Sequence, residues 1–272
     1  MSRALAPSPR PPRGLVRLGR PPGRLTHGRW LPGPRLAPSI EHFWYVTWAL
    51  PAGVRHVQAS LGHPVVHVVV EGGAASVVGV SRGRHEAALE GRGWVLGTKF
   101  LPGAFRPLLG APVSTLTGRR VPLADVVGAR RAGAYLRAVL AGRDGRARMT
   151  AARRFWEEIL PPPEGDLELL GRLLDAAAHD RAIRRVEDLV ERFGLSKREL
   201  QRWFRDAVGI GPKWAIARYR LHEALLALEA GAPGGLGRLA HDLGYADQAH
   251  FARDFRALVG MPPSEYLRRS RG

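Results

Sequence analysis

The sequence of 272 residues contains no cysteine. Disulfides, thiolate nucleophiles and cysteine-ligated zinc or iron–sulfur sites are therefore excluded, and the composition fits a reducing compartment. No apolar run approaches the ~18 residues that a membrane span needs, and no apolar segment follows the N-terminal arginines as a secretory signal requires. These absences predict a soluble, cytoplasmic protein without a membrane partner.

Acidic residues are also scarce, with 24 Asp and Glu against 42 Lys and Arg, so the formal net charge is +18. A balance this basic indicates a polyanionic partner, most often nucleic acid. Residues 1–40 hold eight arginines, nine prolines and no acid. The segment has too little apolar surface to offset the entropy cost of ordering the chain, so residues 1–38 are predicted to be a disordered basic leader. Its arginines either grip DNA phosphates or have no function.

The last ninety residues contain an internal repeat, in which residues 186–212 recur as residues 236–263. Each copy has apolar residues at helical spacing, a glycine at which a helix can end, and then Ser196 or Asp247 as the N-cap of a second helix. Helix, glycine turn and capped helix form a helix-turn-helix. The sequence therefore predicts two such units, joined by a helix over residues 213–230.

The second helix of each unit has one apolar and one basic face when it is projected at 100° per residue. Arg202 matches Arg253 and Arg205 matches Arg256 between the two copies. A lone charged helix face is usually just solvated, but matched arginines in two repeats favour a function. Arg can pair with guanine and Gln with adenine in the major groove. A connecting helix of about 27 Å can place two such helices near one turn of the duplex apart.

The stretch from Leu243 to Phe251, followed by Phe255, Gly260, Pro263 and Tyr266, resembles the AraC/XylS family of bacterial transcription regulators. The resemblance covers residues 180–268 and implies a DNA-binding domain over residues 179–270.

The resemblance implies base contacts from three residues of each unit, namely Arg198, Gln201 and Arg202 in the first and Gln248, Ala249 and Arg253 in the second. Phosphate contacts are expected from Ser196, Lys197, Arg205, Asp247 and Arg256. Ala249 offers only an apolar contact to a thymine methyl group, so we expect weaker reading by the second unit.

The middle of the chain changes to a β pattern. Two Val-rich runs around Gly72 and Gly73 predict a β-hairpin, and residues 94–100 predict a further strand. Helical spacing then returns up to residue 160. We predict a β-rich domain with C-terminal helices over residues 39–160 and a proline-rich linker over residues 161–178. The fold class is therefore α+β, with an all-α C-terminal domain.

The run from Gly97 to Phe105 resembles β-rich domains that precede AraC-type tails. In the wider family such domains bind small effectors or mediate dimerisation, commonly on a cupin-like barrel. His42, Phe43, Trp44, Tyr45 and Trp48 either line an effector pocket or belong to the core.

His63, His67 and Glu71 have a spacing of four residues, which on a helix would suit a metal. The Val-rich run favours a strand instead, where four residues span about 13 Å, too far for one ion. We predict no metal and no other cofactor.

These patterns predict a sequence-specific transcription regulator that reads two successive major-groove segments of double-stranded DNA and is modulated by its N-terminal domain. RNA polymerase is an expected partner, and a small-molecule effector and a homodimer stay open. The alternative is a non-specific nucleoid-type protein, for which charge alone suffices. Gln beside Arg on both outer faces favours the regulator. Without cysteine, a catalytic triad or a phosphate loop, the sequence predicts no enzyme.

Overall fold

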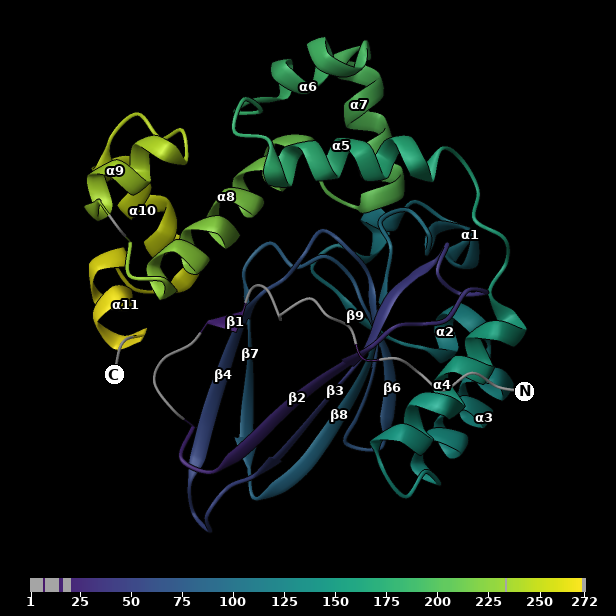
Figure 1. Cartoon of the computed structure of the whole chain (residues 1–272). Helices are drawn as coiled ribbons and strands as arrows, with labels where there is room; N and C mark the ends of the chain where they lie inside the picture. Colours follow the sequence, from purple (N-terminus) through teal and green to yellow (C-terminus); the bar gives the residue numbers. More distant parts are fainter. Residues whose placement is uncertain (1–6, 8–14, 17–20, 233, 271–272) are drawn as a thin grey trace.

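The computed structural model describes residues 7, 15–16, 21–232 and 234–270, and it has the predicted α+β organisation (Figure 1). The strands lie in the N-terminal region and the C-terminal region is helical. The strands are β1 (Leu15–Val16), β2 (Arg24–Trp30), β3 (Ile40–Ala49), β4 (Arg55–Leu61), β5 (His67–Glu71), β6 (Ala74–Val78), β7 (Arg84–Glu90), β8 (Arg92–Phe100) and β9 (Arg120–Pro122).

The strands form two antiparallel sheets, one in the order β2-β3-β8-β5-β6-β9 and one in the order β1-β4-β7. The predicted hairpin is confirmed, since Gly72 and Gly73 join β5 to β6 with φ angles of 57° and 78°. The predicted strand over residues 94–100 is confirmed as part of β8. At the centre of the large sheet, Trp44 of β3 lies opposite Gly97 of β8. A Cβ atom at Gly97 would lie 1.9 Å from the Trp44 ring, so only glycine fits there.

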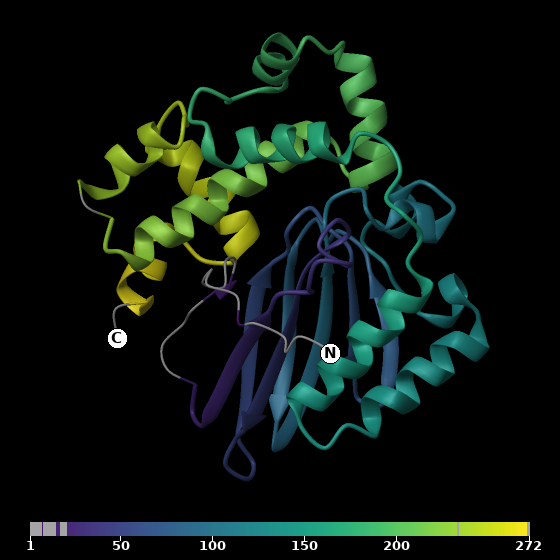
Figure 2. The same cartoon turned by 45° about the vertical axis from the view of Figure 1, so that its right-hand side comes forward.

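Helices cover one face of the large sheet (Figure 2). These helices are α1 (Arg106–Leu109), α2 (Ala124–Val127), α3 (Ala129–Leu140) and α4 (Gly145–Ile159), with a short 3-10 helix at Val113–Leu116. Their apolar faces bury Tyr135 and Trp156 against Phe43 and Phe100 of the sheet. Burial of such large aromatic surfaces makes this layer the core of the N-terminal region.

The predicted disorder of residues 1–38 is wrong for the segment that includes β2. All of β2 pairs with β3, and Trp30 and Leu36 pack in the core. Backbone pairing with a neighbouring strand supplies the stabilisation that the composition of this segment lacks. Most of the remaining predicted leader, residues 1–6, 8–14 and 17–20, lies outside the described residues.

The predicted linker is shorter than expected, because α5 (Leu167–His179) occupies most of it. Asp166 caps this helix by accepting a hydrogen bond from the Leu169 amide at 2.8 Å. Leu170, Leu173 and Leu174 are buried against the helices of the first helix-turn-helix unit. The proline run thus ends before the helix begins, and α5 belongs to the C-terminal region.

The other C-terminal helices are α6 (Val186–Phe193), α7 (Lys197–Trp203), α8 (Pro212–Glu229), α9 (Gly235–Asp242), α10 (Gln248–Val259) and α11 (Pro263–Ser270). A π-helical turn at Phe204–Val208 follows α7. The two ends of α8 belong to two separate apolar cores. The core around α9–α11 also takes in Val16, Ala59 and Leu61 from the small sheet, so the two regions pack directly on each other.

Among the described residues, no helix combines the length and apolar character that crossing a bilayer requires.

Candidate nucleic-acid interface

The first helix-turn-helix unit consists of α6, a glycine turn and α7. Gly194 ends α6 in the left-handed region with a φ of 65°. The Glu199 amide donates a hydrogen bond to Ser196 Oγ at 3.2 Å, and the Ser196 amide donates one to the Glu199 carboxylate at 3.0 Å. This reciprocal capping box fixes the first turn of α7. The predicted N-cap at Ser196 is confirmed.

The second unit repeats this design with α9 and α10. Gly244 turns the chain with a φ of 76°, and Asp247 accepts a hydrogen bond from the His250 amide at 2.6 Å. The predicted N-cap at Asp247 is confirmed. Because α10 is twelve residues long and buries Phe251 and Phe255, its apolar face is fixed against the rest of the unit.

The structure brings the predicted DNA-contacting side chains onto one exposed helix face in each unit. On the first unit the exposed residues are Arg198, Gln201, Arg202 and Arg205, and on the second they are Gln248, Ala249, Arg253 and Arg256. The opposite faces are buried, as expected for helices that dock through one side. The base and phosphate roles of these residues stay predictions.

The end of α7, the second helix of the first unit, differs from the regular helix that the sequence predicts. After Trp203 the backbone changes to a π-helical turn, closed by a hydrogen bond from the Gly209 amide to the Phe204 carbonyl at 2.8 Å. A π turn holds more residues than an α turn, so Arg205 does not follow the 100° projection. Thr117 of the N-terminal region donates a hydrogen bond to the Gly209 carbonyl at the end of this turn.

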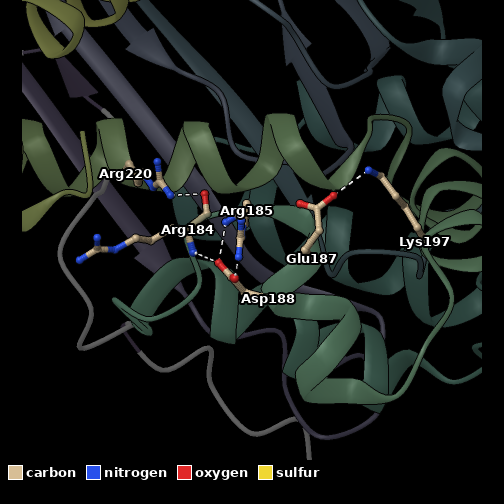
Figure 3. A network of polar contacts seen from close by, with 6 residues as sticks. All are labelled: Arg184, Arg185, Glu187, Asp188, Lys197 and Arg220. Carbon is tan, nitrogen blue, oxygen red and sulfur yellow. Dashed lines mark hydrogen bonds and ion pairs between the residues drawn. The ribbon is translucent and has the colours of Figure 1, made fainter. Parts of the chain in front are cut away.

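Three of the predicted phosphate-contacting side chains also have partners within the protein. Ser196 and Asp247 cap their helices, as described above. Lys197 Nζ lies 2.6 Å from Glu187 Oε1 of α6 (Figure 3). The hydrogen bond from Lys197 lowers the pKa of the Glu187 carboxyl. A phosphate that binds Lys197 must therefore compete with Glu187 or share the ammonium group.

A polar network that sequence reasoning missed ties α6 to the connecting helix α8 (Figure 3). Asp188 accepts hydrogen bonds from the Arg184 and Arg185 amides at 2.7 and 2.8 Å. Desolvation raises the pKa of Asp188, but the amide bonds together with the hydrogen bond and the charge of the Arg185 side chain lower it by more. Arg220 of α8 donates a hydrogen bond to the Arg184 carbonyl. The network fixes the start of the first unit on the helix that carries the second.

The connecting helix α8 has 18 residues and so spans about 27 Å, as predicted. Its Arg218 is only 2% exposed and points into the N-terminal region. The guanidinium lies 4.3 Å from the Trp214 ring centre and donates to the Arg82 carbonyl at 2.6 Å. Burial lowers the pKa of Arg218 to about 10, which leaves it charged at neutral pH.

Both helix-turn-helix units contact the N-terminal region through arginines. Arg106 of α1 forms an ion pair with Asp206 at 3.3 Å beside the first unit. Arg84 of β7 donates to the Val259 carbonyl at the end of α10, at 2.5 Å. The position of each unit is therefore linked to that of the strands.

A second group of polar residues lies on the face of the large sheet opposite its helices. Trp44 Nε1 donates to His67 Nδ1 at 3.2 Å, and Lys99 Nζ lies 2.8 Å from Glu41 Oε2. The pocket interpretation of the aromatic cluster is not supported: Phe43 and Tyr45 are core residues, while Trp44 and Trp48 lie over glycines.

The three residues considered for a metal point to different partners. His67 accepts from Trp44, the His63 ring lies 4.4 Å from the His222 ring, and Glu71 forms an ion pair with Arg120 at 3.2 Å. Within the described part of the chain, no three His, Asp or Glu side chains lie close enough to hold a metal ion.

His67 predicts a loss of stability in acid. Burial is the main cause that lowers the pKa of His67 from 6.5 to about 3. The nearby Lys99, His42 and Arg29 lower it further, and Glu41 opposes them. Between these two pH values His67 is protonated in the unfolded chain and neutral in the folded chain. The free energy of unfolding should therefore fall as the pH drops below about 6.5, by up to ~1.4 kcal/mol per pH unit.

Denaturant unfolding between neutral and acidic pH measures this effect. The variant His67→Gln keeps an acceptor for Trp44 and removes the titrating ring, so its stability should fall less steeply with pH. Equal slopes for the two proteins would contradict the assignment to His67.

Sequence comparisons identify the C-terminal region. Residues 189–269 match the family model of a helix-turn-helix domain. A curated protein of Streptomyces lividans, named as an AraC-like transcription regulator, is 32% identical over 81 residues. The C-terminal region is an AraC-type helix-turn-helix domain. The aligned segment covers 30% of this chain and 26% of the length of the Streptomyces protein.

The N-terminal region matches another family, a domain of unknown function (DUF6597), over residues 28–122. This match begins within β2, in agreement with the structure. Two solved structures of ToxT from Vibrio cholerae align with this chain. The first covers 85% of this chain and 99% of its own chain. The second, with a bound unsaturated fatty acid, covers 82% of this chain and 86% of its own. Both are 11% identical to this chain, with TM-scores of 0.42 and 0.38. Likeness at this level assigns no ligand and no operator to the protein.

Proposed function

We propose that this protein is a sequence-specific transcription regulator that reads two successive major-groove segments of double-stranded DNA. The observation that carries the proposal is the AraC-type domain with two capped recognition helices, each presenting Gln and Arg on an exposed face. Base contacts then come from Arg198, Gln201, Arg202, Gln248, Ala249 and Arg253, and phosphate contacts from Ser196, Lys197, Arg205, Asp247 and Arg256. As a regulator it works in the cytoplasm with RNA polymerase and catalyses no reaction.

The proposal gives the N-terminal region a modulating role. Arg84 contacts the second unit, and Arg106 and Thr117 contact the first. A small-molecule effector or a second copy of the chain that shifts these contacts would change the relative position of the two units. We place the modulating domain at residues 24–160 and the DNA-binding domain at residues 166–270, with a short linker between them.

Selection of genomic fragments by the purified full-length protein tests the proposal. At about 150 mM salt, where phosphate contacts are partly screened, the bound fragments should share a motif of two blocks about one helical turn apart. Enrichment of no sequence above bulk DNA would contradict it and favour the non-specific nucleoid-type protein, because charge alone binds every sequence alike.

A further inference from the structure

A groove of about 380 Å³ lies where the N-terminal region meets the first helix-turn-helix unit. Arg82, Ser114 and Thr117 line it from the N-terminal side. Gln201, Arg205 and Lys213 line it from the helical side. The 3-10 helix at Val113–Leu116 packs on the π-helical turn that follows α7. Figure 1 shows the helices of the first unit above the upper end of the sheets.

The groove is cationic and has no carboxylate in its lining. Arg82, Arg205 and Lys213 are all exposed, and none of them forms an ion pair with another described residue. The acid nearest to Arg205 in sequence, Asp206, pairs with Arg106 instead. Three cations without a counter-charge repel one another, and a bound anion relieves this repulsion.

The chemistry of the lining suits a phosphate group. Ser114 supplies a hydroxyl that can donate a hydrogen bond to a phosphate oxygen. Arginine and lysine form charge-assisted hydrogen bonds with phosphate. Helix α8 begins at the groove with Pro212 and Lys213, so the positive end of its dipole adds to the same potential.

The position of the groove indicates which phosphate fills it. Gln201 and Arg205 belong to the exposed face of the first recognition helix. A duplex seated on that face brings its sugar-phosphate backbone past the edge of the helix, where phosphate contacts fix the register. The Arg82 backbone is held at this edge, because its carbonyl accepts a hydrogen bond from Arg218 at 2.6 Å.

We propose that this groove is a phosphate-binding site shared by the N-terminal region and the first helix-turn-helix unit, and that a backbone phosphate of bound DNA fills it. The proposal rests on the proposed DNA-binding function and extends it: the N-terminal region contacts the duplex itself through Arg82. A free phosphate ester has the same chemistry, and the experiment separates the two sources.

The test compares the full-length protein with Arg82→Ala, Lys213→Ala and the control Arg92→Ala, using a random-sequence duplex between about 50 and 200 mM salt. Arg92 is an exposed arginine at the start of β8, whose other end is Phe100. The control therefore removes one positive charge from the N-terminal region, as Arg82→Ala does. Arg82→Ala and Lys213→Ala should each lower the slope of log affinity against log salt by about one. Over this fourfold range in salt, the ratio of wild-type to variant affinity should shrink about three- to fourfold.

Arg82→Ala with the same slope as Arg92→Ala would overturn the DNA assignment. A parallel thermal-melting series in inorganic phosphate separates the other outcomes. If phosphate stabilises the wild type and not Arg82→Ala while the duplex slopes stay equal, the groove takes a free phosphate ester. A wild type that binds no duplex refutes the proposed function, and the phosphate series then still decides whether the groove binds phosphate. No effect of Arg82→Ala in either series refutes the site.

Discussion

Trp156→Ala should destabilise the N-terminal region by about 3–5 kcal/mol, the usual cost of removing a fully buried aromatic side chain. Trp156 is completely buried on α4 and lies at the centre of an aromatic cluster with Phe100, Phe155 and Tyr135. Its indole also donates a hydrogen bond to Thr98 Oγ1 of β8 at 3.0 Å. The substitution therefore opens a cavity between the helix and the sheet, and it removes the indole N–H that donates a hydrogen bond to Thr98 Oγ1.

Denaturant unfolding followed by near-ultraviolet circular dichroism measures this loss, because the signal reports the packed aromatic cluster. Trp156→Phe is the matched control: it keeps most of the apolar contact and loses the hydrogen bond, so it should cost less, about 1–2 kcal/mol. An alanine variant as stable as the wild type would mean that α4 does not hold the sheet in the way described.

The helix-turn-helix units were predictable because their signals are local. Ser196 and Asp247 cap helices whose first turns lie within three residues of them, and Gly194 and Gly244 end the preceding helices. The repetition of the same pattern about fifty residues later then favours a functional face over a merely solvated one. The predicted exposure of the recognition residues followed from helical periodicity alone.

The features that sequence reasoning missed depend on distant partners. Residues 1–38 are basic and rich in proline as a whole, a composition that predicts disorder, but pairing with β3 orders the part that forms β2. The burial of Arg218 needs the carbonyl groups of residues 81–83, more than 130 positions away. The end of the π turn at Gly209 is held by Thr117. No periodicity or propensity records contacts of this kind.

Arg202→Ala and Arg253→Ala should each weaken binding to the selected DNA motif by about 1–3 kcal/mol, or fivefold to 150-fold, and each should relax the preference at one position of the motif. The two arginines occupy matched positions of the repeat and are exposed on α7 and α10. Because they lie on different units, their effects should add in the double variant. Repeating the fragment selection with each variant measures affinity and preference together.

The two variants should not be equivalent in sequence preference. In the first unit Arg198 and Gln201 stay beside Arg202, so the first block of the motif should survive with one position degenerate. In the second unit Gln248 stays, but the neighbouring Ala249 can only contact a thymine methyl, so Arg253→Ala should leave a second block that is weaker than the first and degenerate at the position that Arg253 reads. The exposed Arg130→Ala on α3 removes the same charge away from the recognition helices and should leave both blocks intact. Unchanged preference in both recognition variants would mean that these helix faces do not read the bases.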